Sequence, residues 1–306
     1  MAHTDHSKQT DTDRTRRRRL RREVPSTVGL LADERDFTAM RRYDTFDFDD
    51  HATYLRQIDA LLRSLTAQGV HTTVALFDPD EYAEFCAAGG HDPDTTASRS
   101  RYTATIPATG AAVAYTGQPL DTLVPQLINT AVRRATWEYV TALLADLGAC
   151  ADCGQDIGRA AFDRASRLLF TLLEAAGPGI HHIVCSIPAD DEQLLASLQA
   201  NRSDPADLDT FAAVDPTEGA EFVSVLAAGI ALERPGGVVL RTTAPGTPDR
   251  LHGWRLLHGD LVPLTEAEVF SAYCTDADTG EPLSPESGVE YRAGFDLGPD
   301  PTDHHH

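Results

Sequence analysis

The sequence predicts an α/β fold in which a mixed sheet is flanked by helices, with a long helical hairpin and a C-terminal antiparallel β extension. From residue 27 onward, short apolar runs alternate with stretches of helical periodicity. Two long helical patterns follow one another, and the C-terminal part holds short β patterns separated by Gly and Pro. With 306 residues, 42% of them hydrophobic, the chain is long enough for one large domain or two small ones.

The first part of the chain has the alternating order of an α/β sheet. Residues 27–32 predict a buried strand, and 33–40 a short helix. A helix is predicted over 50–68, with Gly69 as its stop. Strand 71–77 and a helix opened by Asp78 and continuing to about residue 88 come next. Two segments, 102–106 and 111–115, are expected to pair as a hairpin around residues 108–110.

The middle of the chain predicts two long helices, over about 120–147 and 157–176, joined by a turn rich in Gly and Cys. The elements expected after them are a strand at 181–187, a short helix at 194–198, a loop at 201–217, a helix at 218–232 and a strand at 238–243. Three short strands, 254–257, 269–273 and 289–295, complete the prediction. We therefore expect one α/β domain over 26–297, of which 245–297 is either an extension of the sheet or a small β subdomain, and a disordered tail at 298–306.

Charge is distributed unevenly along the chain, whose net charge is −21. Residues 1–22 carry eight basic and three acidic side chains, whereas the remainder carries 18 basic and 44 acidic ones. We expect residues 1–25 to be a disordered basic arm. An acidic body repels phosphate backbones, so any contact with a nucleic acid or another polyanion is expected only through this arm. The candidate contact residues are Arg16, Arg17, Arg18, Arg19, Arg21 and Arg22.

The sequence contains no candidate for a transmembrane helix and no secretory signal. The longest nearly unbroken apolar run, residues 223–232, has about half the length of a bilayer span. The apolar stretch after the arginines ends at the charged residues 33–36. A cytoplasmic location is the resulting expectation, and the five cysteines need not pair there.

The CxxC turn, Cys150-Ala151-Asp152-Cys153, is a candidate zinc site, because two thiolates at this spacing can occupy one edge of a tetrahedral metal site. His181 and Cys185 are the nearest candidates for further ligands. The alternatives are a redox pair and a tight turn between two helices with no chemistry, and the tight turn is the favoured interpretation.

Asp33, Asp78 and Asp80 are candidate catalytic carboxylates, because Asp33 and Asp78 follow the first two predicted strands, where α/β sheets bind ligands. Asp78-Pro79-Asp80 resembles the DxD motif of haloacid dehalogenase-type phosphohydrolases. That resemblance implies a nucleophilic Asp78 and Mg²⁺ held by both carboxylates. Glu81 and Tyr82 depart from the motif, and its later Ser/Thr and Lys elements are missing. The favoured alternative is helix capping, with Pro79 in the first helical turn.

No complete catalytic motif is present, so the leading hypothesis is a cytoplasmic interaction, regulatory or assembly factor. It would bind a protein partner or self-associate through the long, apolar-striped helices. The alternatives are a divalent-metal-dependent hydrolase using Asp33, Asp78 and Asp80, and a zinc-stabilised module built on the CxxC turn. Zinc or magnesium is accordingly the cofactor to test.

Overall fold

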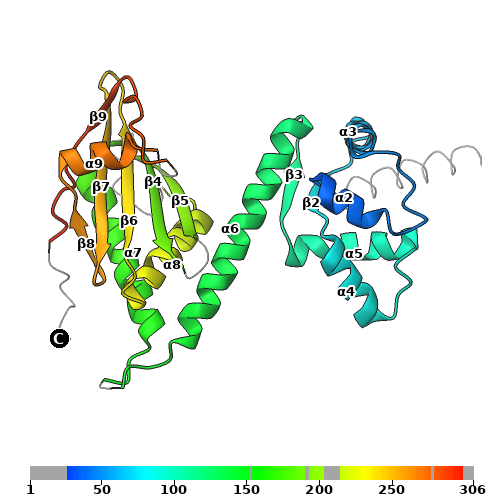
Figure 1. The fold of residues 1–306 in the computed structure, drawn as a ribbon, viewed down its shortest axis with the longest axis horizontal. Coiled ribbons are helices and arrows are strands. Elements are labelled where there is room, and N and C mark those ends of the chain that lie inside the picture. The colour runs from blue at the N-terminus through cyan, green and yellow to red at the C-terminus, as the bar shows by residue number, and fades with distance from the viewer. Residues whose placement is uncertain (1–25, 152, 190–192, 203–213, 277–278, 299–306) are drawn as a thin grey trace, which may run out of the picture. The chain divides into compact units, whose positions relative to one another are not determined.

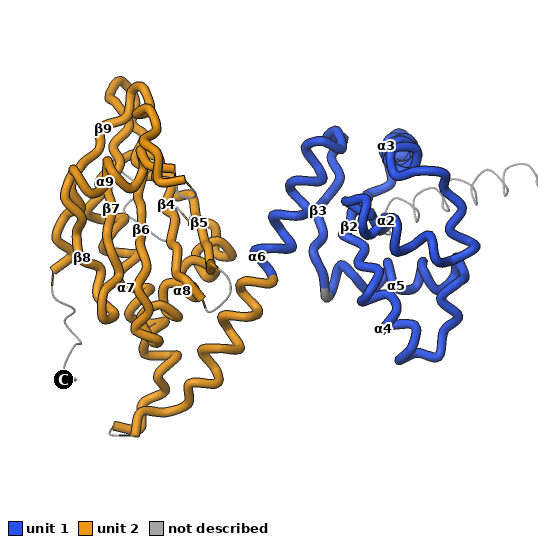
Figure 2. Tube along the Cα trace, in the orientation of Figure 1, with its two compact units in different colours: residues 1–134 blue, residues 135–306 orange. Residues whose placement is uncertain are grey.

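The computed structural model describes residues 26–151, 153–189, 193–202, 214–276 and 279–298. The chain divides into two compact units, unit 1 over residues 1–134 and unit 2 over residues 135–306 (Figure 2). The described residues form eight helices and two mixed sheets, of three and six strands. The predicted α/β class, with sheets flanked by helices, is confirmed (Figure 1).

Unit 1 is built on a three-stranded sheet in the order β1-β2-β3. β1 (Ser26–Leu30) and β2 (Thr72–Leu76) are parallel, so their carboxyl ends lie at the same edge, and β3 (Ala112–Tyr115) is antiparallel to β2. Four described helices lie wholly within this unit: α2 (Glu34–Met40), α3 (His51–Ala67), α4 (Pro79–Gly89) and α5 (Thr96–Thr109). Its core contains fully buried Leu30, Leu62, Val74 and Tyr82 together with several other aromatic rings.

The predicted hairpin at 102–106 and 111–115 is wrong, because residues 96–109 form helix α5. The Thr95 side chain caps this helix by accepting a hydrogen bond from Ser98 N. Tyr102 and Ile106 are buried one helical turn apart. The β-branched and aromatic residues suggested a strand, but burial of this i, i+4 pair favours the helix.

Unit 2 contains a six-stranded sheet in the order β5-β4-β6-β7-β8, with β9 pairing to β7. Its strands are β4 (Gly179–Pro188), β5 (Gln193–Arg202), β6 (Gly236–Thr243), β7 (Asp249–Leu257), β8 (Asp260–Pro263) and β9 (Val289–Tyr291). Neighbours are antiparallel, except that β9 is parallel to β7. The strands near the C-terminus thus extend the same sheet.

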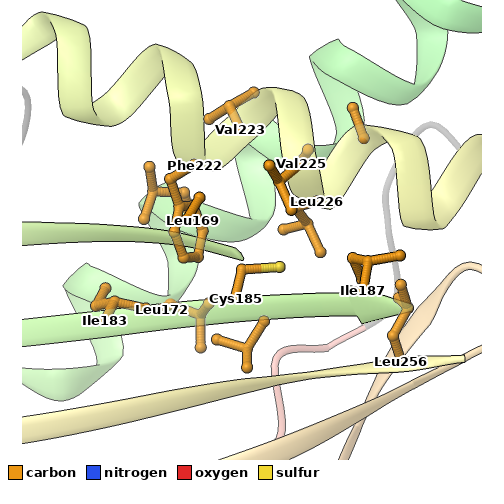
Figure 3. Packing of buried hydrophobic residues seen from close by; sticks show 14 of the residues in the cluster. Leu169, Leu172, Ile183, Cys185, Ile187, Phe222, Val223, Val225, Leu226 and Leu256 are labelled. Atoms are coloured by element: carbon orange, nitrogen blue, oxygen red, sulfur yellow. The ribbon is translucent and has the colours of Figure 1, made fainter. Parts of the chain in front are cut away.

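One face of this sheet packs against α7 (Ile157–Ala176) and α8 (Pro216–Ala231). Figure 3 shows Ile183, Cys185 and Ile187 of β4 lying among apolar side chains of both helices. α8 buries residues 222–230 without interruption, because it is apolar all round.

Two short elements of unit 2 differ from the prediction. Residues 194–198, predicted as helix, belong to strand β5, where Leu194, Ala196, Leu198 and Ala200 are buried at alternate positions. Residues 269–273, predicted as strand, belong to helix α9 (Glu266–Tyr273), which a Thr265–Glu268 capping box starts. In both segments the apolar pattern is too short to distinguish the period of a helix from that of a strand.

Helix α6 (Leu120–Asp146) begins in unit 1 and ends in unit 2. Leu123 and Leu127 join the core of unit 1, and Val140 joins the core of unit 2. The two long helices, α6 and α7, follow one another across residues 147–156, as the sequence predicts. Within the described residues, no helix combines the length and the apolar character that crossing a bilayer requires.

Candidate functional site

Two predicted site carboxylates, Asp33 and Asp78, lie at the carboxyl edge of the parallel strands of unit 1, and both cap helices. Asp33 accepts a hydrogen bond from Asp36 N at 2.8 Å at the start of α2. Asp78 Oδ1 accepts from Asp80 N at 2.7 Å and from Glu81 N at 3.0 Å at the start of α4. These carboxylates therefore satisfy backbone N–H groups of the first helical turns.

The same edge contains a carboxyl group that sequence reasoning missed, Asp36. Burial raises its pKa above the usual value, and the negative charges of Asp33, Asp78 and Asp80 raise it further. The structure thus brings the three predicted carboxylates within electrostatic reach of Asp36. Across the described residues, however, no group of three or more His, Cys, Asp or Glu side chains could hold a metal ion.

A pocket of about 350 Å³ opens beside this edge. Leu31 and Phe77, which line it, lie just beyond the ends of β1 and β2. The full lining is Gly29, Leu31, Met40, Thr45, Phe46, Phe48, Tyr54, Ile58, Phe77, Thr96, Arg99 and Thr103. A pocket at the carboxyl ends of parallel strands has the usual location of a ligand site in an α/β sheet.

Tyr54 of α3 holds the apolar side of this pocket together. Its hydroxyl accepts a hydrogen bond from Leu31 N at 3.1 Å and donates one to Gly29 O at 3.4 Å. Burial raises the pKa of Tyr54 to about 12. The ring centroid of Phe48 lies 5.2 Å from that of Tyr54 and 4.8 Å from that of Phe46.

Arg99 is the charged residue of the pocket lining and binds the loop that carries Thr45. Its guanidinium donates to Thr45 Oγ1 at 2.9 Å, to Thr45 O at 3.0 Å and to Thr96 Oγ1 at 3.3 Å. Asp94 holds the same loop by accepting from Asp44 N, Thr45 N and Thr45 Oγ1. Those hydrogen bonds lower the pKa of Asp94 below its usual value.

The candidate zinc ligands lie in different environments. Cys150 and Cys153 belong to a tight turn in which Gly154 N donates to Cys150 O at 2.8 Å. Cys185 is fully buried, and burial raises its thiol pKa to about 12. His181 is also fully buried, with its ring nitrogens 3.0 Å from Thr242 Oγ1 and from Gly177 O. The described residues do not bring these side chains together as a metal site.

The arginines of the predicted basic arm lie outside the described residues.

A second pocket, of about 290 Å³, lies between α7 and α8 in unit 2. Apart from Ser166, its lining is apolar or glycine: Phe162, Leu169, Phe170, Leu173, Val214, Pro216, Gly219, Ala220 and Val223. The Ser166 hydroxyl donates to Phe162 O at 2.8 Å, so its polar group is satisfied within α7.

Helix α6 carries a row of exposed apolar residues, which we call the α6 seam: Pro125, Ile128, Val132, Ala135, Tyr139 and Ala142. Ile128 is 45% exposed, Val132 57% and Tyr139 49%. The residues are spaced by alternating steps of three and four, which place them on one helix face. This row differs from the stripe that buries Leu123 and Leu127 in unit 1.

The match found in the comparisons with known proteins lies within unit 1. No curated protein and no solved structure matches the chain. Residues 15–118 match the family model described as "Domain of unknown function (DUF8829)". The described part of that match contains β1, β2, β3 and the four helices α2 to α5, so this similarity includes the carboxyl edge and its pocket.

Proposed function

We propose that this protein works by interaction, as a regulatory or assembly factor, and that it self-associates as a dimer through the α6 seam. The observation that carries this proposal is the spacing of six exposed apolar residues along one helix. The seam contains no charged residue, although the net charge of the chain is −21. Large exposed apolar side chains in a row favour association, because burying them removes apolar area from water.

The proposed partner of the α6 seam is the same helix of a second copy of the chain. The seam's alternating steps of three and four residues are those of a heptad repeat, in which apolar residues recur on average about every 3.5 residues and two helices keep contacting each other. It spans about 25 Å of helix at 1.5 Å per residue. Large and small residues also complement one another when the helices run antiparallel around Ala135. Ile128 then meets Ala142 of the partner, and Val132 meets Tyr139.

The first experiment measures the mass of the full chain by light scattering after size-exclusion chromatography. The expected mass is twice the 33.1 kDa of one chain. Val132→Asp places a charge in the seam and is expected to give a monomer with an unchanged circular dichroism spectrum, since Val132 is exposed. Thr141→Asp is the matched control, because Thr141 is exposed on the same helix outside the seam. A monomeric wild type, or a dimer that survives Val132→Asp, contradicts the proposal.

A second experiment tests the direction of the helices. In the antiparallel arrangement, residue 135 lies near the two-fold axis and faces its own copy. Ala135→Cys is therefore expected to give a covalent dimer under mild oxidation, whereas Thr141→Cys is not. Because Cys150 and Cys153 are already partly or fully exposed, both variants are compared with oxidised wild type. Equal cross-linking at residues 135 and 141 contradicts the antiparallel arrangement.

One observation favours a second candidate function, a divalent-metal-dependent hydrolase. Besides burial, the negative charges of Asp33, Asp78 and Asp80 contribute to the raised pKa of Asp36 at the carboxyl edge of the sheet in unit 1. Turnover of phosphate esters with Mg²⁺, lost in Asp78→Asn while the melting temperature is kept, would support it. Metal analysis of the purified chain tests the zinc alternative at the same time. If the wild-type chain does not turn over phosphate esters, the hydrolase function is excluded and the interaction proposal is kept.

A further inference from the structure

The pocket in unit 1 has one polar wall, which Arg99 dominates. Two of the five N–H groups of its guanidinium, Nε–H and the second hydrogen of Nη1, have no acceptor among the described residues. The acceptors it does have are neutral oxygens, and no described carboxylate lies within ion-pair distance of it. A partly buried guanidinium with unused donors is a site for an anionic acceptor.

A second polar group on this wall lacks a protein partner. The Thr103 hydroxyl lines the pocket and makes no hydrogen bond with the described residues. Thr103 lies one helical turn after Arg99 on α5, so both side chains are on the same face of that helix. A hydroxyl and a guanidinium placed this way can bind the same acceptor group.

Most of the remaining pocket lining is apolar and aromatic. Phe46, Phe48 and Tyr54 contribute a cluster of rings with centroids 4.8–5.9 Å apart. Phe77, Leu31, Met40 and Ile58 are the other apolar side chains of the lining. A ring placed against these side chains would gain both apolar burial and the edge-to-face contacts that aromatic pairs prefer.

The size of the pocket limits the ligand. Its volume of about 350 Å³ is at the small end of ligand pockets. It is equivalent to about a dozen water molecules at their liquid volume of about 30 Å³. A single ring with a short polar group fits that volume.

We propose that this pocket binds a small aromatic carboxylate, with the carboxylate on Arg99 and Thr103 and the ring against Phe46, Phe48 and Tyr54. The hydrogen bonds of the Asp94 carboxylate go to the amide and hydroxyl of Thr45 and to Asp44 N, and they lower the pKa of Asp94. The charge of Arg99 contributes to this lowered pKa, but Asp94 forms no ion pair with Arg99. The proposed site is separate from the α6 seam, so its test is independent of self-association.

The test uses benzoate as the probe and the full chain, with binding followed by ligand-observed NMR and calorimetry. Benzoate is expected to bind saturably, at least tenfold more tightly than benzyl alcohol, which has the ring without the charge. Benzamidine, with a cationic group, is expected to bind more weakly than either. Phenyl phosphate distinguishes a carboxylate site from a general anion site and should bind more weakly than benzoate.

Variants then locate the site. Arg99→Gln is expected to weaken benzoate binding at least tenfold, whereas Arg101→Gln should leave it unchanged, because Arg101 is exposed on the same helix and does not line the pocket. Thr103→Met fills the pocket and should abolish binding. It also provides a second test if loss of the Arg99 bonds to Thr45 unfolds the first variant. Absence of saturable benzoate binding, equal affinity for benzyl alcohol, or binding that survives both Arg99→Gln and Thr103→Met overturns the proposal.

Discussion

At the scale of single residues, unit 1 depends on a few buried polar atoms that join strands to helices. The Tyr54 hydroxyl connects α3 to the end of β1 through Leu31 N and Gly29 O. Gly29 leaves room for the neighbouring side chains there, since a Cβ at this position would lie 3.0 Å from both Phe77 Cδ2 and Thr103 Oγ1. Small changes at these atoms therefore affect both stability and the pocket.

Removing the Tyr54 hydroxyl tests this connection. Tyr54→Phe leaves the buried amide of Leu31 without its acceptor, so we expect a loss of about 1–2 kcal/mol in the free energy of unfolding. Urea denaturation measures it. Tyr273→Phe is the control, because Tyr273 is 44% exposed and lies outside the α6 seam, and its effect should stay within about 0.5 kcal/mol. Equal losses for the two variants would show that the Tyr54 hydrogen bonds contribute nothing.

The raised pKa of Asp36 predicts a pH dependence. The folded state binds the Asp36 proton more tightly than the unfolded chain, so this group costs stability as pH rises from the ordinary carboxyl pKa of 3.8 through the folded value. Asp36→Asn is therefore expected to raise the melting temperature at pH 7. The corresponding gain in the free energy of unfolding should be less than about 1 kcal/mol, because the group is partly exposed. The gain should disappear at pH 3, where Asp36 is protonated in both states. Glu34→Gln, in the same helical turn, should show no such gain.

At the scale of elements, α6 and α7 show how one glycine permits close packing. A Cβ at Gly158 in the first turn of α7 would lie 2.4 Å from Leu144 O of α6. The close contact involves backbone, which cannot rotate away. Glycine is therefore required where the two helices meet.

Gly158→Ala is accordingly expected to destabilise unit 2, although alanine usually favours a helix over glycine by about 1 kcal/mol. We expect a net loss of about 1–3 kcal/mol from the clash, measured by chemical denaturation. Gly219→Ala in α8 is the control, since its added Cβ would meet only Val214 Cγ1, at 3.1 Å. It should be neutral or stabilising. A neutral result at Gly158 would show that α7 can shift to accommodate a methyl group.

At the scale of the whole molecule, the chain consists of two units that share one long helix. Each unit has its own core of buried residues. The sequence shows no linker at the boundary between residues 134 and 135, because the boundary lies within α6.

Deleting residues 1–22 tests the basic segment that precedes β1 in the sequence. We expect the melting temperature to remain unchanged, because Leu20 is the main apolar side chain of this segment. If its arginines contact a polyanion, retention of the full chain on heparin should fall steeply with salt and be lost on deletion. A melting temperature lowered by many degrees would indicate that the segment packs on the rest of the chain.

The sequence by itself determined the elements with strong local signals. Helix α7 was predicted at its observed bounds, because its apolar period is sustained, and in the structure Asp156 caps its start and Gly177 follows its last residue. The capping carboxylates Asp33 and Asp78 could likewise be read from their position after apolar strands. Strand β5 and helices α5 and α9 were not predicted. Their apolar patterns fit both the helical and the strand period, and burial in the folded chain decides between helix and strand.

Only the tertiary structure decided which side chains meet. The pocket combines Thr45, Tyr54 and Arg99 from separate segments, and no spacing in the sequence predicts that the Arg99 guanidinium lines it with only neutral oxygens as hydrogen-bond acceptors. The α6 seam required burial as well, because the sequence shows apolar residues all round that helix and cannot tell which of them face a core. Local periodicity specifies elements, whereas contacts between distant segments specify sites, and such contacts are set by packing of the whole unit.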